Sequence, residues 1–116
     1  MLVKDPIHTF YLDLPQPLAE TYASRISSQA YSSICTPTLH EGWRGMPITY
    51  ILCGNDKAVD PDVIQRPTVA FLREHGYKER LEVIETDSSH SPFLSQANLC
   101  TKVIEEAVLM SGDAGK

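Results

Sequence analysis

Two short apolar runs, separated by a helical pattern, constrain the fold of this chain most strongly. The first, Ile48–Cys53, lies between Pro47 and Gly54 and is almost continuously apolar. That pattern is typical of a strand buried on both faces of a parallel sheet. The second run, Leu81–Thr86, partly alternates between apolar and polar residues. Because a strand, a helix and a parallel strand form a right-handed crossover, the sequence predicts an α/β fold.

The segment between the two runs predicts a helix with an interrupted start. Asp60 suits an N-cap, and Pro61 suits the first helical position. Pro67 lies beyond the first turn, where a proline removes a helical hydrogen bond at a cost of about 3 kcal/mol. We therefore predict a short first turn and a helix restarted over residues 67–75. Gly76 is expected to end this helix as a left-handed cap.

The strand–helix–strand–helix region is predicted to span residues 48–110 and to end in an amphipathic helix. The remaining segments precede or follow this region. Residues 1–16 are predicted to be an irregular lead-in, because prolines interrupt them. Residues 17–47 predict an amphipathic helix to about residue 29, followed by a long loop. Residues 111–116 predict a frayed tail.

Length and charge narrow the classes of partner. The 116 residues suit one domain, and the formal net charge is -5. Lysine and arginine form no cluster, so neither nucleic acid nor an anionic membrane surface is an expected partner. Neutral small molecules are the expected substrates. No run approaches the 18 apolar residues of a membrane span, and the sequence predicts a soluble, cytoplasmic protein.

The cysteines and histidines predict neither a metal site nor another cofactor. Cys35, Cys53 and Cys100 are widely spaced, which favours reduced, buried thiols over a disulfide. The four histidines show no metal-ligand spacing. We therefore predict that the chain binds no metal and no cofactor.

A histidine on a polar turn is the sharpest candidate for chemistry. His90 follows the second apolar run and precedes the last helix, with serines on both sides. A catalytic base has to exchange protons with its substrate, and a turn held by a rigid scaffold suits that task. A solvated turn histidine explains the position alone equally well.

Asp56 is the expected partner of His90. It follows the first apolar run as His90 follows the second, and a crossover brings the carboxyl ends of both strands to one edge. A carboxylate there would orient and stabilise the imidazole. Taken alone, Asp56 also fits ordinary turn chemistry. Asp60 is better explained as a helix cap, and Asp87 is too close in sequence to His90.

No serine or cysteine is a convincing nucleophile. Ser89 and Ser91 neighbour His90 on its own turn, and Cys53 lies within a buried strand, where the pKa of a thiol rises. The remaining candidates lack the glycines of a G-x-S-x-G elbow; these are Ser27, Ser28, Ser32 and Ser33. The chain is therefore expected to lack the nucleophile of a triad.

Four segments resemble the carboxyl-terminal half of α/β-hydrolases of the plant methylesterase and hydroxynitrile lyase type, and especially their fungal relatives. The resemblance covers roughly residues 8–108. It rests on residues 10–15, on the tryptophan segment 42–50, on the turn 53–56 and, most specifically, on 89–96. It implies that Asp56 is the acid and His90 the base of a catalytic triad.

The resemblance also implies a partial α/β-hydrolase fold, a βαβα portion of a parallel sheet preceded by a cap-to-sheet helix. The implied activity is hydrolysis of a small-molecule ester in secondary metabolism. Because the serine elbow and the oxyanion hole are missing from these residues, we expect a truncated domain that is inactive alone. Two alternatives stay open: a non-catalytic binding subunit that self-associates or pairs with another chain, and a gene fragment without a stable fold.

Overall fold

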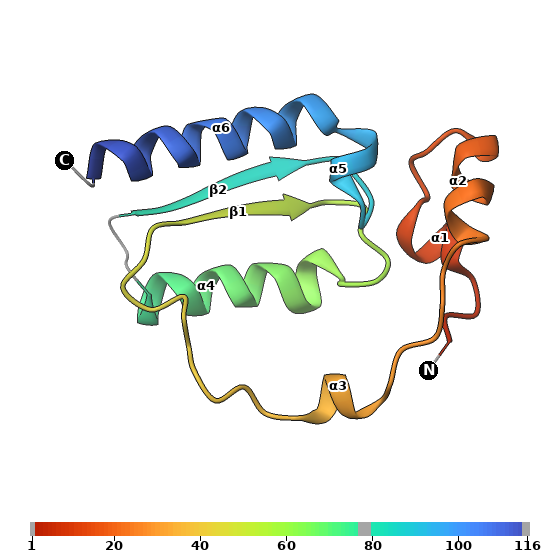
Figure 1. The fold of residues 1–116 in the computed structure, drawn as a ribbon, viewed down its shortest axis with the longest axis horizontal. Helices are drawn as coiled ribbons and strands as arrows, with labels where there is room; N and C mark the ends of the chain where they lie inside the picture. The colour runs from red at the N-terminus through yellow and green to blue at the C-terminus, as the bar shows by residue number, and fades with distance from the viewer. Residues whose placement is uncertain (1, 77–79, 115–116) are drawn as a thin grey trace.

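A two-stranded parallel sheet lies between two long helices in the computed structural model, which describes residues 2–76 and 80–114. Helix α4 (Arg66–His75) lies on one side of the strands and helix α6 (Ala97–Ala114) on the other (Figure 1). Two short helices, α1 (Pro6–Phe10) and α2 (Gln16–Ala23), lie together beyond the ends to which both strand arrows point (Figure 1). The helices and the parallel pair form a mixed, α/β arrangement.

The two strands span the residues predicted from the apolar runs. Strand β1 (Ile48–Cys53) pairs in parallel with β2 (Leu81–Thr86), with Ile48 opposite Leu81 and Cys53 opposite Thr86. This register aligns the carboxyl ends of both strands. The loops that carry Asp56 and His90 therefore leave the sheet side by side.

The connection between the strands has the interrupted start that the prolines predict. A π-helical turn, η1 (Pro61–Gln65), begins behind Asp60, whose carboxylate accepts hydrogen bonds from the N–H groups of Asp62 and Val63. Helix α4 follows, with Pro67 in its first turn. A proline there has no N–H to leave unpaired in the helix.

Gly76 does not adopt the left-handed conformation that we predicted. Its φ is -94°, and its N–H donates to the carbonyl of Leu72 at 2.7 Å. An added Cβ would lie only 2.6 Å from that same carbonyl oxygen. Glycine is therefore needed here for close packing of the backbone, not for a positive φ.

The amino-terminal third contains more helix than we predicted. Residues 1–16 are not wholly irregular, because Asp5 accepts a hydrogen bond from the His8 N–H and caps α1. Helix α2 ends at Ala23, well before the predicted end near residue 29. A four-residue helix, α3 (Ser32–Cys35), interrupts the predicted long loop.

The carboxyl-terminal helix is longer than its sequence pattern indicates. A short helix, α5 (Pro92–Ser95), follows His90, and α6 then continues past residue 110 to Ala114. The prediction of a frayed tail from residue 111 is wrong for residues 111–114, and residues 115–116 lie outside the described part of the chain.

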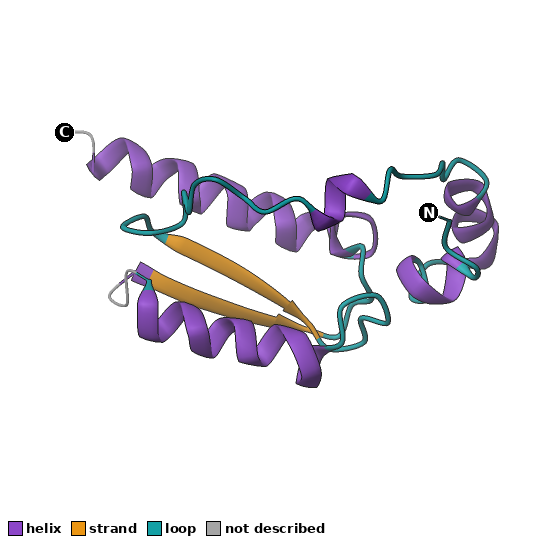
Figure 2. Cartoon of the chain, turned by 90° about the horizontal axis from the view of Figure 1, so that it is seen from below, coloured by secondary structure: helices purple, strands orange, loops and turns teal. Residues whose placement is uncertain are grey.

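The buried apolar core is small and lies beside the carboxyl end of β1. Among the described residues, four apolar side chains are buried: Ala19, Leu52, Cys53 and Val69. Figure 2 shows the strand pair between α4 and α6 from a second direction. The turns at the strand ends, by contrast, bury several polar residues, and Asp56, Ser88, Ser89 and Ser91 lie there.

Candidate active site

Backbone hydrogen bonds continue from the sheet into the two turns that follow it. The Gly54 N–H donates to the carbonyl of Thr86 at 2.8 Å, and the Asn55 N–H donates to the carbonyl of Ser88 at 3.1 Å. The side-chain amide of Asn55 donates to the carbonyl of Asp87 at 2.7 Å. These bonds hold the loop of Asp56 against the turn that carries His90.

Asp56 and His90 meet as the sequence predicts. Nδ1 of His90 lies 2.9 Å from Oδ2 and 3.1 Å from Oδ1 of Asp56, across 34 positions of sequence. A carboxylate only accepts hydrogen bonds, so Nδ1 carries the proton and Nε2 is left as a proton acceptor. This is the tautomer that a general base requires.

The Asp56 carboxylate is buried and surrounded by donors. Its side chain is 5% exposed, whereas that of His90 is 36% exposed. Oδ1 also accepts hydrogen bonds from the N–H groups of Ala58, at 2.8 Å, and Val59, at 2.9 Å. A buried charge needs such partners, and they fix the carboxylate toward the imidazole.

The side-chain amide of Gln65 also reaches this loop. It contacts the backbone of Cys53, the carbonyl of Val59 and Oδ2 of Asp56. Gln65 was not among the residues predicted at the site. An isolated glutamine next to a proline-interrupted helix has no pattern that marks it as part of a site.

A second residue that the sequence analysis missed, Asp13, anchors the turn of His90. Oδ2 of Asp13 accepts a hydrogen bond from the Ser89 N–H at 3.0 Å, and Oδ1 accepts one from the Ser89 hydroxyl. Partial burial acts to raise the pKa of Asp13, but hydrogen bonds, chiefly from Ser89 and also from Ser95, outweigh it and the pKa lies below its ordinary value. The segment of Asp13 is thereby tied to a turn 76 positions away.

The same segment places an aromatic ring against the imidazole. The ring centroids of Phe10 and His90 lie 5.2 Å apart, with an angle of 44° between the planes. The Phe10 carbonyl oxygen lies 3.2 Å from the hydroxyl oxygen of Ser89. The imidazole is thus contacted by Asp56 through Nδ1 and by Phe10 through its ring.

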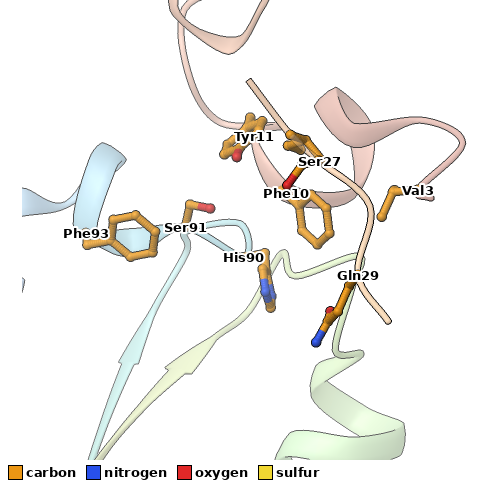
Figure 3. Close-up of a pocket in the computed structure, with 9 residues that line it drawn as sticks. Val3, Phe10, Tyr11, Ser27, Gln29, His90, Ser91 and Phe93 are labelled. Carbon is orange, nitrogen blue, oxygen red and sulfur yellow. The ribbon is translucent and has the colours of Figure 1, made fainter. Parts of the chain in front are cut away.

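A pocket of about 310 Å³ opens beside His90 (Figure 3). Most of its lining side chains are apolar or aromatic: Val3, Phe10, Tyr11, Ile26 and Phe93. Ser27, Gln29 and Ser91 add a few polar groups. An apolar pocket with few polar groups suits a small, largely uncharged molecule.

The competing sequence candidates have structural roles elsewhere. Asp60 caps η1, as predicted, and Asp87 is exposed and contributes its backbone carbonyl to Asn55. Burial raises the pKa of the Cys53 thiol, with a partial offset from the Ser88 hydroxyl, which makes Cys53 a poor nucleophile. Ser89 is fully buried and bonded to Asp13. Among the described residues, the His90 ring forms its hydrogen bonds with Asp56 and not with a serine.

Two classes of feature are absent from the described residues. No group of three or more histidine, cysteine or acidic side chains there is placed to hold a metal ion. No helix in residues 2–76 and 80–114 is long and apolar enough to cross a membrane.

Comparisons with known proteins give a likeness to a curated hydrolase. No protein family matches the sequence, and no solved structure matches it. A curated protein from Aspergillus novofumigatus (strain IBT 16806), named "Alpha/beta hydrolase nvfD", is 27% identical over 90 residues. The aligned region covers 78% of this chain but only 34% of the relative, so the chain spans about a third of that protein. The parallel α/β arrangement and this likeness together support a relationship between the chain and the α/β-hydrolases.

Proposed function

We propose that this chain supplies the acid and the base of a serine-hydrolase triad that hydrolyses a small-molecule ester. Asp56 is the acid and His90 the base. The observation that carries the proposal is the contact of 2.9 Å between Oδ2 of Asp56 and Nδ1 of His90 beside an apolar pocket. In such a triad the carboxylate holds the tautomer and stabilises the imidazolium that forms, while Nε2 exchanges the proton of the nucleophile.

The pocket supports an ester with a small apolar group as the substrate. Phe10, Tyr11 and Phe93 line it, and the aromatic wall would bury an acyl or alkyl group of the substrate. The methylesterase-like subtype and a place in secondary metabolism are part of this proposal, supported by the motif around His90. Neither a metal nor another cofactor has a part in the proposed reaction.

The nucleophile and the oxyanion hole come, in this proposal, from another polypeptide segment. Among the described residues, no serine side chain is bonded to His90, and no glycine-flanked serine elbow stands in the sequence. A base without its nucleophile contributes little to acyl transfer. The segment that completes the site has to place a serine hydroxyl against Nε2 of His90.

A chimeric enzyme tests this function directly. In the Aspergillus relative, the segment that aligns with this chain would be replaced by this chain, and hydrolysis of a short-chain p-nitrophenyl ester would be followed. His90→Ala and Asp56→Asn should each lower kcat/KM by about 10⁴-fold, because the base or its tautomer is lost. His40→Ala is the matched control, since His40 lies exposed in a loop.

The two substitutions should act as one unit. The double variant should be no slower than the His90→Ala single variant, because members of a triad are strongly non-additive. Turnover that survives His90→Ala at the level of the His40→Ala control would rule out the assigned roles.

A binding subunit without catalysis is the second candidate, and the exposed apolar residues of α6 favour it. Ile104, Val108 and Leu109 are each more than 60% exposed. Surfaces of this kind commonly mark interaction sites. In that case the chimera should fold, but neither Asp56→Asn nor His90→Ala should change its rate of ester hydrolysis.

A further inference from the structure

The buried amide of Gln65 makes contacts of a kind that surface glutamines do not. Gln65 is 3% exposed. Its Oε1 accepts a hydrogen bond from the Cys53 N–H at 2.9 Å. Its Nε2 lies 2.7 Å from the carbonyl oxygen of Val59, 3.1 Å from that of Cys53 and 3.3 Å from Oδ2 of Asp56. One side chain therefore accepts one N–H and faces three oxygen acceptors.

These contacts fix the loop 53–59, which carries Asp56, at both of its ends and at its middle. Cys53 is the last residue of β1, Val59 immediately precedes the N-cap of η1, and Asp56 lies midway between them. The loop also closes on itself, because the Asp56 carboxylate accepts the N–H groups of Ala58 and Val59. The Gln65 side chain thus connects the two ends of the loop 53–59.

A primary amide is the group that fits this position. Glutamate would direct a second oxygen at the three acceptor oxygens that Nε2 now faces. Methionine, of similar length, would leave the Cys53 N–H and the Val59 carbonyl without the partners that Gln65 provides, which is costly for buried groups. The orientation of the amide is set by the Cys53 N–H, because only Oε1 can accept it.

The wide turn of η1 delivers this side chain to the loop. The Gln65 N–H donates to the carbonyl of Asp60, five residues back, at 3.1 Å. Pro67 lies just beyond, where it has no N–H to extend the turn. Single π-helical turns inside helices are often found at functional sites. Here the turn brings the Gln65 amide within hydrogen-bonding distance of Asp56.

We propose that Gln65 is a positioning residue that holds the Asp56 carboxylate on Nδ1 of His90. This inference rests on the proposed function, because Gln65 acts only through the acid of the Asp56–His90 pair. Gln65 makes no hydrogen bond to the imidazole, which bonds to Asp56, and it does not line the pocket beside His90. Its substitution should therefore alter the imidazole of a chain that is still folded.

The test is NMR spectroscopy of the chain with ¹⁵N-labelled histidine, with the His90 signals assigned through His90→Gln. In the wild type, His90 should show a single tautomer with a hydrogen-bonded Nδ1–H proton. Gln65→Met should lose that proton signal and show averaged ring-nitrogen shifts, while circular dichroism reports a folded chain. Gln96→Met is the matched control, because Gln96 is exposed, and it should leave the spectrum unchanged.

Asp56→Asn separates this inference from the proposed function. If Asp56→Asn leaves the His90 spectrum unchanged, the Asp56–His90 pair and the proposed function both fail. If Asp56→Asn changes the spectrum and a folded Gln65→Met does not, only the role of Gln65 is overturned. A Gln65 that merely stabilised the fold would lower Tm and leave the His90 signals of the folded chain as they are.

A measurement on the wild type covers the case in which Gln65→Met does not fold. The side-chain amide protons of Gln65 should then exchange with solvent more slowly than those of Gln96, because the Gln65 side chain is buried and donates to the backbone oxygens of Cys53 and Val59. Gln65→Asn, too short to reach both ends of the loop, should also lose the Nδ1–H signal. Rapid exchange at Gln65, or an unchanged signal in Gln65→Asn, would overturn the proposal.

Discussion

Two cysteines of this chain should differ in reactivity because their side chains differ in burial. Cys53 is buried and its pKa is raised by burial, whereas Cys35 is exposed. The reactive form of a thiol is the thiolate. At pH 8, Ellman's reagent should therefore modify Cys35 rapidly and Cys53 only on unfolding. Peptide mass analysis would locate the modified cysteine. Rapid modification of Cys53 in a folded Cys35→Ser chain would contradict the burial of this strand end.

Asp13 predicts how stability depends on pH. Its pKa in the folded chain lies below the ordinary value of 3.8. Its contribution to stability is therefore complete above about pH 4 and is lost as the pH falls through the lowered pKa. Asp13→Asn should cost about 1 kcal/mol in urea denaturation at pH 6, below the usual range of about 1.5 to 3 kcal/mol for bonds to a charged group, because Asp13 is exposed.

The same substitution should cost less at pH 3, because the unfolded chain binds a proton at Asp13 below the ordinary pKa of 3.8, whereas the lowered pKa of the folded chain opposes that protonation. Asp87→Asn is the control, since Asp87 is exposed on the same turn as Ser89. An equal loss at both pH values would show that the Asp13 carboxylate does not supply the bond to Ser89.

The residues of the site divide into those with a sequence pattern and those without one. Asp56 and His90 follow apolar runs, so their meeting could be predicted from strand topology alone. Asp13 and Gln65 carry no such pattern, because their partners are fixed only once the chain has closed. The cause is physical: a buried amide or carboxylate is selected by the donors and acceptors around it, and those come from other elements.

At the scale of elements, two glycines near helix ends give opposite expectations. Gly76→Ala should destabilise the chain by about 1 to 3 kcal/mol, because the added Cβ would lie 2.6 Å from the Leu72 carbonyl oxygen. Gly112→Ala should stabilise it by about 0.5 kcal/mol, because nothing lies within 4 Å of that position and alanine favours helix. Thermal melting of both variants is the measurement, and a gain from Gly76→Ala would contradict the close packing described here.

Elements with strong boundaries were predictable, and elements that depend on packing were not. Strand β1 lies between Pro47 and Gly54, so its bounds follow from local chemistry. Helix α1 follows an aspartate cap and is only five residues long. A helix this short cannot show an apolar period in its sequence. Helix α6 runs through Gly112 because helix propensity is a weak preference that context overrides.

The whole molecule exposes more surface than a chain of its mass usually does. Its accessible surface is 8396 Å², against about 6,300 Å² for a compact monomer of 12.9 kDa. Its radius of gyration is 16.1 Å, against about 13 Å for a compact domain of this length. The excess agrees with the small apolar core and with the exposed face of α6.

We therefore expect the isolated chain to self-associate, to bind a partner or to unfold partly. Sedimentation at low micromolar concentration should show species larger than a monomer, or thermal melting should give a broad transition. A monodisperse monomer with a sharp transition above about 65 °C, beyond the usual range of mesophilic domains, would contradict this expectation.

The isolated chain should also show no ester hydrolysis above background. Its described residues provide the Asp56–His90 pair but no serine bonded to His90. A p-nitrophenyl ester assay with wild type and His90→Ala is the check. Turnover by the wild type that disappears in the variant would reveal a nucleophile within this chain.

The parallel register of β1 and β2 links the site to folding itself. Asp56 and His90 leave different strands, and the connection between them runs through η1 and α4. Their contact therefore exists only after the whole crossover has closed. The hydrogen-bonded Nδ1–H proton of His90 can thus report the fraction of chains in which the crossover is closed. A remote substitution that opens the crossover should lower the intensity of this signal without moving it, because the closed chains keep the same contact.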